Sequence, residues 1–195
     1  KLDQFKDAQS LFSMVKDRDI ILWSSMIALT TNQGLGKEAY ELYEQMKQEG
    51  AMPDIVTFIS ILDAHASEMN IRDGKHLHAS VAHMDLTSET ILLTCLINMY
   101  GKCSDIGNAR DMFDSILQPS VISWNALLGV YVHQERCNEA FQTFNDLQQA
   151  SILPNSTTFP CILDACADHA TLPEGKRIDV LIRNSCFESD IVVKT

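Results

Sequence analysis

The sequence predicts an all-α protein, a right-handed α-solenoid in which helix-turn-helix hairpins stack side by side into a superhelix. Three observations lead to this prediction. The chain matches itself after a displacement of 101 residues, apolar residues recur at helical spacing, and glycine and proline separate the apolar runs. Because one helical hairpin cannot bury both of its apolar faces, such hairpins have to stack on one another.

The long repeat is anchored by uncommon residues. Trp23 matches Trp124, and Pro53 matches Pro154, after the same displacement. Shorter blocks that also agree are 38–39 with 139–140, 57–58 with 158–159, 61–64 with 162–165, and 74–75 with 175–176. A period of this length is typical of repeat arrays rather than of one globular core.

Three unequal units of 35, 35 and 31 residues fill the period. The predicted units are residues 20–54, 55–89, 90–120, 121–155 and 156–190. Residues 1–19 are predicted to be the tail of a further unit, and residues 191–195 the start of another. Five whole units exceed the roughly three that such an array needs for stability.

Each unit is predicted to form two helices, because its apolar residues lie at i, i+3 and i+4 and therefore share one helical face. In the first helices these residues are Trp23, Met26, Ile27; Phe58, Ile61, Leu62; Leu93, Leu96, Ile97, Tyr100; Trp124, Leu127, Leu128, Tyr131; and Phe159, Ile162, Leu163. In the second helices they are Ala8, Leu11, Phe12, Val15; Ala39, Leu42, Tyr43, Met46; Ala109, Met112, Phe113, Ile116; and Ala140, Thr143, Phe144, Leu147. Breakers are expected at Gly34, Gly36, Gly50, Pro53 and Pro154, and no segment favours a strand.

Composition and motifs exclude several classes of protein. No apolar run reaches the roughly 20 residues of a membrane-spanning helix, and no targeting leader precedes the first predicted helix. The six cysteines form no C-x-x-C pair, which argues against zinc and a disulfide framework. His76 and His78 are two residues apart, so they cannot form the i, i+4 pair of a metalloprotease. The sequence therefore predicts no enzyme, no cofactor and no metal.

The stretch Val121-Ile-Ser-Trp-Asn-Ala-Leu-Leu, continuing through Asn138-Glu-Ala-Phe to Leu153-Pro-Asn155, resembles a pentatricopeptide repeat. The order of 35, 35 and 31 residues is similar to the P, L and S units of the PLS-type proteins of land plants. By this resemblance 20–54 and 121–155 are P units, 55–89 and 156–190 are L units, 90–120 is an S unit, and 1–19 and 191–195 are partial S units. The resemblance implies a PPR/TPR-like superhelix that binds single-stranded RNA, one base per repeat, in a mitochondrion or chloroplast, for RNA editing or processing.

In that family the fifth and last residues of a unit select the base. The corresponding pairs are Ser24 with Asp54, Thr94 with Ser120, and Asn125 with Asn155, which resemble guanine-, adenine- and pyrimidine-selecting pairs respectively. Ile59 with Glu89 and Pro160 with Asp190 depart from any such pair, so the L units are expected to be silent. The residues expected to sandwich bases are Ile21, Val56, Ile91 and Ile122, with Thr157 departing from the pattern, and those expected to contact phosphate are Lys1 and Lys102.

Two sets of residues have simpler interpretations. Ser24, Thr94 and Asn125 are also the types of residue that favour the first turn of any helix. Trp23 and Trp124 could stack on bases, although their place on the apolar face favours core packing.

The net charge of −11 has the wrong sign for a protein that grips phosphates. First helices in units 20–54 and 90–120 are nearly uncharged, so the acidity is expected on the outer helices, and we expect weak or no RNA binding by this chain alone. The alternative function is a protein-binding α-solenoid scaffold that docks partner or editing-cofactor proteins. Apolar residues at Leu11, Phe12 and 191–193 are expected to be exposed, which favours end-to-end self-association.

Overall fold

The computed structural model describes residues 2–68, 71–84, 86 and 89–169 of the chain, and this part contains ten α-helices and no strand. The helices are α1 (Leu2–Met14), α2 (Ile20–Asn32), α3 (Gly36–Gln48), α4 (Ile55–Glu68), α5 (Ile71–His83), α6 (Thr90–Lys102), α7 (Ile106–Asp114), α8 (Val121–His133), α9 (Cys137–Gln149) and α10 (Thr158–His169). The all-α prediction is therefore confirmed. The chain forms two compact units, Lys1–Met99 and Tyr100–Thr195.

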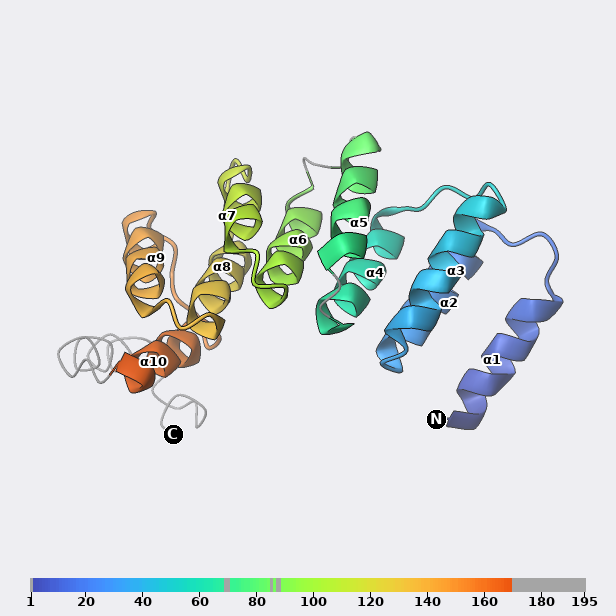
Figure 1. The fold of residues 1–195 in the computed structure, drawn as a ribbon, viewed down its shortest axis with the longest axis horizontal. Coiled ribbons are helices and arrows are strands. Elements are labelled where there is room, and N and C mark those ends of the chain that lie inside the picture. The colour runs from blue at the N-terminus through green and yellow to red at the C-terminus, as the bar shows by residue number, and fades with distance from the viewer. Residues whose placement is uncertain (1, 69–70, 85, 87–88, 170–195) are drawn as a thin grey trace. The chain divides into compact units, whose positions relative to one another are not determined.

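In the first compact unit, helical hairpins pack in sequence order (Figure 1). Helix α2 contacts both its hairpin partner α3 and the first helix of the next hairpin, α4. Helix α4 in turn contacts α3 and α5, and α1 packs on α2. The first helices α2 and α4 thus lie against one another, and they begin at Ile20 and Ile55, the first residues of two predicted repeats.

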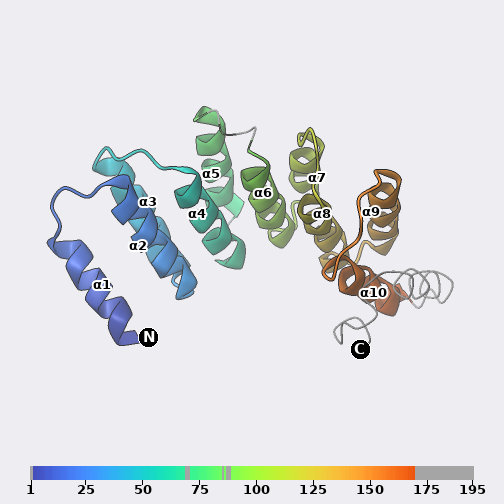
Figure 2. The same cartoon turned by 180° about the vertical axis from the view of Figure 1, so that it is seen from behind.

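The second compact unit repeats this arrangement, as the view from behind shows (Figure 2). Helix α8 contacts α7, its hairpin partner α9 and the following first helix α10, and α9 also contacts α10. Near the end of α6, Gly101 packs against Val130 of α8, and Gln134 Nε2 donates a hydrogen bond to the Gly101 carbonyl. The first helices of neighbouring hairpins therefore again pack together.

The predicted apolar faces form the core. Trp23, Ile27 and Phe58 of the first helices are fully buried, as are Ala39 and Phe144 of the second helices. This agreement follows from helical geometry, since residues at i, i+3 and i+4 share a face.

The N-terminal hairpin departs from the predicted pattern. Helix α1 ends at Met14, so Val15 lies beyond the helix and is exposed, which contradicts its predicted place on the buried face. Leu11 is 65% exposed, as expected for an apolar edge, whereas Phe12 is only 7% exposed. Phe12 is buried because its ring packs edge-on against Trp23, with the centroids 4.9 Å apart.

Arg18 joins the first three helices. Its guanidinium donates to the Phe12 carbonyl at 3.1 Å and to Glu49 Oε1 at 2.8 Å. The same group lies 4.6 Å from the Phe12 ring centroid and 5.2 Å from that of Trp23. The Arg18 side chain is only 12% exposed, although that of Glu49 is 37% exposed. The bond to the Phe12 carbonyl and the ring contacts are therefore better shielded from water than the ion pair itself.

The helix ends are set by local hydrogen bonds and glycines. Asp19 and Ser120 accept hydrogen bonds from N–H groups in the first turns of α2 and α8. Gly34 and Gly50 adopt φ of 75° and 79° after α2 and α3, which suits a residue without Cβ. Gly36, predicted as a breaker, is instead the first residue of α3, where the missing Cβ is tolerated because the helix is only beginning.

Candidate functional site

The first predicted base-selecting pair offers only hydrogen-bond acceptors. The Ser24 hydroxyl donates its proton to the Ile20 carbonyl at 2.9 Å, and the residue is only 6% exposed. Asp54 Oδ1 accepts from the Thr57 backbone N–H at 2.8 Å and the Thr57 hydroxyl at 2.7 Å. Within the described residues Asp54 Oδ2 accepts no hydrogen bond, so oxygen lone pairs on Ser24 and Asp54 are what a ligand could use.

Asn125 and Asn155, the third predicted pair, are directly bonded to one another. Asn125 Nδ2 donates to Asn155 Oδ1 at 3.0 Å. The buried hydroxyl of Thr158 lies 2.7 Å from Asn125 Oδ1 and 3.0 Å from Asn155 Oδ1. The backbone N–H groups of Thr157 and Thr158 also donate to Asn155 Oδ1, at 3.0 and 3.1 Å. The structure thus brings together two residues that lie 30 positions apart in the sequence.

These bonds decide which groups of Asn125 and Asn155 are left over. Asn155 Oδ1 already accepts several hydrogen bonds, while no described residue accepts one from its Nδ2. One N–H of Asn125 is engaged, and one remains. An amide nitrogen carries two donors and no acceptor, so this pair offers mainly donors, the opposite of Ser24 and Asp54.

The two residues of the second predicted pair, Thr94 and Ser120, lie in different compact units. The Thr94 hydroxyl donates to the Thr90 carbonyl at 2.8 Å, and the residue is 8% exposed. Ser120 is exposed and accepts a hydrogen bond from the Ser123 N–H at the start of α8.

The interpretation of Ser24, Thr94 and Asn125 as helix-start residues is not what the structure shows. The residues that cap first helices are Asp19, Asp54, Ser120 and Asn155, each just before a helix. Ser24 and Thr94 lie one turn inside a helix and bond back to it, and Asn125 bonds to the cap of the next helix.

The four residues predicted to sandwich bases are strongly exposed, although each is a branched apolar residue. The exposed fractions are 69% for Ile21, 53% for Val56, 61% for Ile91 and 66% for Ile122. Each lies in the first turn of a first helix. A single exposed aliphatic residue is ordinary, but its recurrence at the same position in four hairpins indicates a repeated apolar surface element.

The remaining predicted residues fall as follows. Lys102 is exposed in the last turn of α6, whereas Lys1 lies outside the described residues. In the units expected to be silent, Ile59 and Pro160 are half-buried and Glu89 is exposed, and Asp190 lies outside the described residues.

Trp23 belongs to the core, whereas Trp124 is half-buried. Trp23 is fully buried, and its indole lies against Phe12, which confirms the core interpretation for this residue. Trp124 packs its ring against Phe113 with centroids 4.7 Å apart. The indole N–H groups of both residues are buried with no hydrogen-bond acceptor among the described residues. The fully buried ring of Trp23 is therefore not placed to stack on an incoming base.

Charge is distributed between the helices only in part as expected from the sequence. Helices α2 and α8 contain no Asp, Glu, Lys or Arg, while α3 contains five such residues. The five in α3 are three Glu and two Lys, and the first helices α4 and α10 each contain two acidic residues and no Lys or Arg. The acidity is therefore not concentrated in second helices, although α2 and α8 themselves are uncharged.

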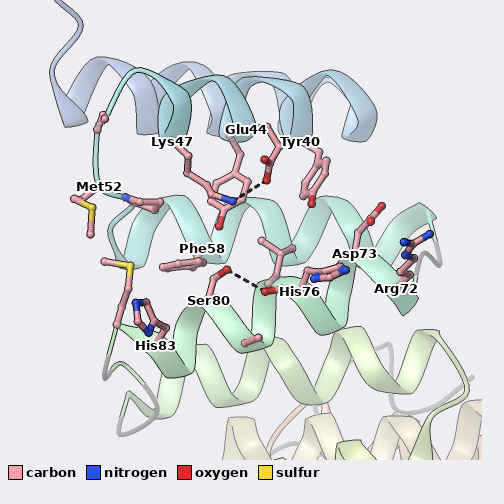
Figure 3. A pocket seen from close by; sticks show the side chains of 17 residues that line it. Tyr40, Glu44, Lys47, Met52, Phe58, Arg72, Asp73, His76, Ser80 and His83 are labelled. Atoms are coloured by element: carbon pink, nitrogen blue, oxygen red, sulfur yellow. Dashed lines mark hydrogen bonds and ion pairs between the residues drawn. The ribbon is translucent and has the colours of Figure 1, made fainter.

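A groove between α3 and α5 is a feature that the sequence analysis did not predict (Figure 3). It has a volume of about 1050 Å³, and Phe58 of α4 lies in it. Tyr40 and Lys47 line it from α3, and His76 and His83 from α5. Burial, reinforced by Glu44 and other nearby groups, raises the pKa of Tyr40 to about 12, so its hydroxyl remains a donor. The feature of the sequence that could have indicated this groove is the presence of aromatic side chains on α3 and α4 and of basic side chains on α3 and α5.

Two kinds of site are absent from the part of the chain that the structure describes. No helix there is long and apolar enough to cross a membrane. No three His, Cys, Asp or Glu side chains in the described ranges are grouped so that they could hold a metal ion.

Comparison with protein families adds to this geometry. The model of the "PPR repeat family" matches residues 18–67 and 119–168, and that of the "PPR repeat" matches residues 91–118. A chloroplastic pentatricopeptide repeat-containing protein of Arabidopsis thaliana is 31% identical over 99% of this chain and 24% of its own length. A mitochondrial one from the same plant is 28% identical over 91% of this chain and 32% of its own length. The chain thus spans about a quarter to a third of these relatives.

Solved structures share the fold at low sequence identity. The pentatricopeptide repeat protein PPR10 in complex with an 18-nt psaJ RNA element has a TM-score of 0.69 and 17% identity, over 90% of this chain and 27% of that one. The PPR domain of Arabidopsis thaliana protein-only RNase P 1, in complex with tRNA, has a TM-score of 0.65 and 13% identity, over 90% of this chain and 97% of that domain. These likenesses show the fold.

Proposed function

This chain belongs to the PPR repeat family, and we propose that it is a sequence-specific single-stranded RNA-binding module that takes one base per repeat. The observation that carries the proposal is the contrast between the two resolved pairs, one of which offers acceptors and the other donors. Support comes from the PPR proteins of similar fold that were solved with RNA bound. The predicted repeat boundaries, including the P, L and S order, are part of the proposal.

The pair of Ser24 and Asp54 suits guanine. The Watson–Crick edge of guanine carries two neighbouring donors, N1–H and the N2 amino group, and these need acceptors. The Ser24 hydroxyl donates its one hydrogen bond to the Ile20 carbonyl, so only its oxygen lone pairs can contact a base, and the Asp54 carboxylate can only accept hydrogen bonds. Adenine and cytosine each present one amino donor beside a ring-nitrogen acceptor, and that acceptor would face an oxygen lone pair of Ser24 or Asp54. This difference favours guanine at the first repeat.

The pair of Asn125 and Asn155 suits a pyrimidine, and cytosine in particular. Cytosine presents two neighbouring acceptors, N3 and O2, which match the leftover N–H donors of the two amides. Uracil replaces one of these acceptors with N3–H. The pair of Thr94 and Ser120 is proposed for adenine by family analogy, and the L-like units are proposed to be silent.

Affinity that does not depend on base identity is assigned to other residues. Ile21, Val56, Ile91 and Ile122 would place apolar surface against base faces, since stacking and apolar contact tolerate every base. Lys102, with Lys1, would meet phosphates. The net charge of −11 opposes this contact, so the chain alone binds RNA weakly and depends on further repeats or partners for affinity.

The names of the relatives support a proposed cellular location. Those reported above are named as chloroplastic or mitochondrial proteins, so we place this protein in a plant organelle. Its proposed task there is RNA editing or processing, with the solenoid selecting the site and no chemistry performed by the residues described.

Fluorescence anisotropy tests the proposal. The RNA carries 5′-G-x-A-C-x-3′ and is compared with RNAs altered at the G or C position, at two salt concentrations. Weak binding that weakens further when G or C is changed is expected. The Asn155→Asp variant should favour U over C, because a carboxylate accepts from N3–H. Tight, sequence-blind binding, or unchanged preference in this variant, would contradict the proposal.

The groove between α3 and α5 favours a second candidate function, a scaffold that docks a partner or editing-cofactor protein (Figure 3). The half-buried Tyr40 and the exposed Met52 line it beside charged residues of both signs, among them Lys47 and Glu44. Such a lining suits an apolar side chain of a partner flanked by polar groups. Ser80→Arg would fill the groove. If docking is the function, this variant should lose partner binding measured by calorimetry, while Asn125→Ala with Asn155→Ala should not.

End-to-end self-association is proposed as well, because Leu11 and Met14 are 65% and 77% exposed on neighbouring turns. Light scattering should show a mass that rises with concentration. A strict monomer at high concentration would contradict it.

A further inference from the structure

Thr158 holds the two amides of its base-selecting pair, an observation whose functional meaning rests on the proposed function above. The residue is 0% exposed, and its hydroxyl lies 2.7 Å from Asn125 Oδ1 and 3.0 Å from Asn155 Oδ1. A hydroxyl has one proton, and the shorter distance assigns it to Asn125. The Thr158 oxygen in turn accepts from the Asn155 backbone N–H at 3.0 Å.

Other buried threonines do not behave in this way. The hydroxyls of Thr30 and Thr143 donate to the carbonyls of Met26 and Glu139, four residues earlier in the same helix. That is the usual use of a threonine inside a helix. Thr158 instead points its hydroxyl at side chains, one of which belongs to the preceding hairpin.

One of these two contacts, that to the side chain that caps the helix, recurs in the first compact unit. Thr57 is also 0% exposed, and its hydroxyl donates to Asp54 Oδ1 at 2.7 Å while its N–H donates to the same oxygen. Thr57 and Thr158 occupy matching positions, three residues after Asp54 and Asn155. Two independent copies of one contact pattern indicate that it belongs to the repeat.

We propose that Thr57 and Thr158 are positioning residues that fix which atoms of the base-selecting side chains face RNA. Thr158 occupies a lone pair of Asn125 Oδ1, so Asn125 presents N–H to the base rather than oxygen. Thr57 holds Asp54 Oδ1 inward, which leaves Oδ2 for the base. A free amide can turn over and exchange its donor and acceptor, and the hydroxyl opposes that turn.

Thr158→Val tests the proposal, because valine keeps the shape and removes the hydroxyl. Base discrimination between C and G at this repeat should fall about fivefold, the equivalent of one hydrogen bond of roughly 1 kcal/mol. Thr158→Ser should restore it. Thr143→Val is the matched control, since its hydroxyl bonds only to a carbonyl of its own helix. Urea unfolding of each variant reports whether the hairpin is intact.

A second measurement does not depend on RNA. In NMR spectra the side-chain amide signals of Asn125 should move, and their exchange should become faster, in Thr158→Val but not in Thr143→Val. If wild type shows no base preference, the proposed function fails, and these signals still decide whether Thr158 orients Asn125. Unchanged discrimination in Thr158→Val beside a discriminating wild type, or unchanged amide signals, overturns the inference.

Discussion

Replacing Gly101 by alanine should destabilise the second compact unit. A Cβ on Gly101 would lie inside van der Waals contact of Val130 Cγ2 and only 3.2 Å from Val130 Cβ. Valine is stiff at χ1, so it cannot turn away, and overpacking of this kind costs about 1–3 kcal/mol. Alanine gains about 1 kcal/mol over glycine in a helix. The net loss is therefore expected to be about 1 kcal/mol.

Gly129 provides a matched control, because it lies in α8 and a Cβ there would meet nothing within 4 Å. Gly129→Ala should stabilise the protein by about 0.5–1 kcal/mol. Gly101→Ala and Gly129→Ala should therefore shift the midpoint of urea unfolding, measured by circular dichroism, in opposite directions. The dependence of the unfolding free energy on urea concentration should be similar in the two variants. Adding Val130→Ala should remove part of the penalty of Gly101→Ala. If Gly101→Ala stabilises as much as Gly129→Ala, the close approach of α6 and α8 is wrong.

Three further predictions concern stability and exposure. Arg18→Ala should lower the free energy of unfolding in urea by about 1–2 kcal/mol, since it removes the hydrogen bond to the Phe12 carbonyl and the ring contacts. Arg136→Ala should lower it by less than about 0.5 kcal/mol, because Arg136 takes part in an exposed ion pair. Equal losses in the two variants would contradict this prediction. Burial raises the pKa of the Cys95 and Cys161 thiols to about 11, so these thiols lose their protons at lower pH in the unfolded chain than in the folded one. The free energy of unfolding should therefore fall as pH rises from about 9 to about 11. A free energy of unfolding that does not change over this pH range would refute the prediction. Ile122→Ser should change the free energy of unfolding by less than about 0.5 kcal/mol, because the residue is 66% exposed. The same variant should bind RNA more weakly in fluorescence anisotropy. A large loss of stability would show that the Ile122 side chain contributes to the core instead.

Spacing in the sequence was enough to predict which face of each helix is buried. Trp23 and Ile27 are buried because a four-residue step returns to the same side of a helix. The same argument failed at Val15, since the helix ends one residue earlier and the periodicity no longer applies. A periodic pattern therefore predicts the buried face of a helix well but predicts the residue at which the helix ends poorly.

Hydrogen-bond partners could not be predicted from residue type. Ser24 resembles a cap in type, but its hydroxyl bonds back to Ile20, because a cap has to precede the first helical residue. The contact of Asn125 with Asn155 joins two hairpins, so it depends on how they pack. The groove between α3 and α5 depends on the spacing of two helices, which no local pattern encodes.

The capping of α4 by Asp54 and of α10 by Asn155 has a consequence for redesign. The proposed base-selecting side chain also caps the following helix, so a substitution made to alter base preference also changes the stability of the start of that helix. Asp, Asn and Ser serve both roles, while a larger apolar substitute would cost about 1 kcal/mol of helix stability. The residues that this position tolerates are therefore limited by helix capping as well as by the proposed contact with RNA.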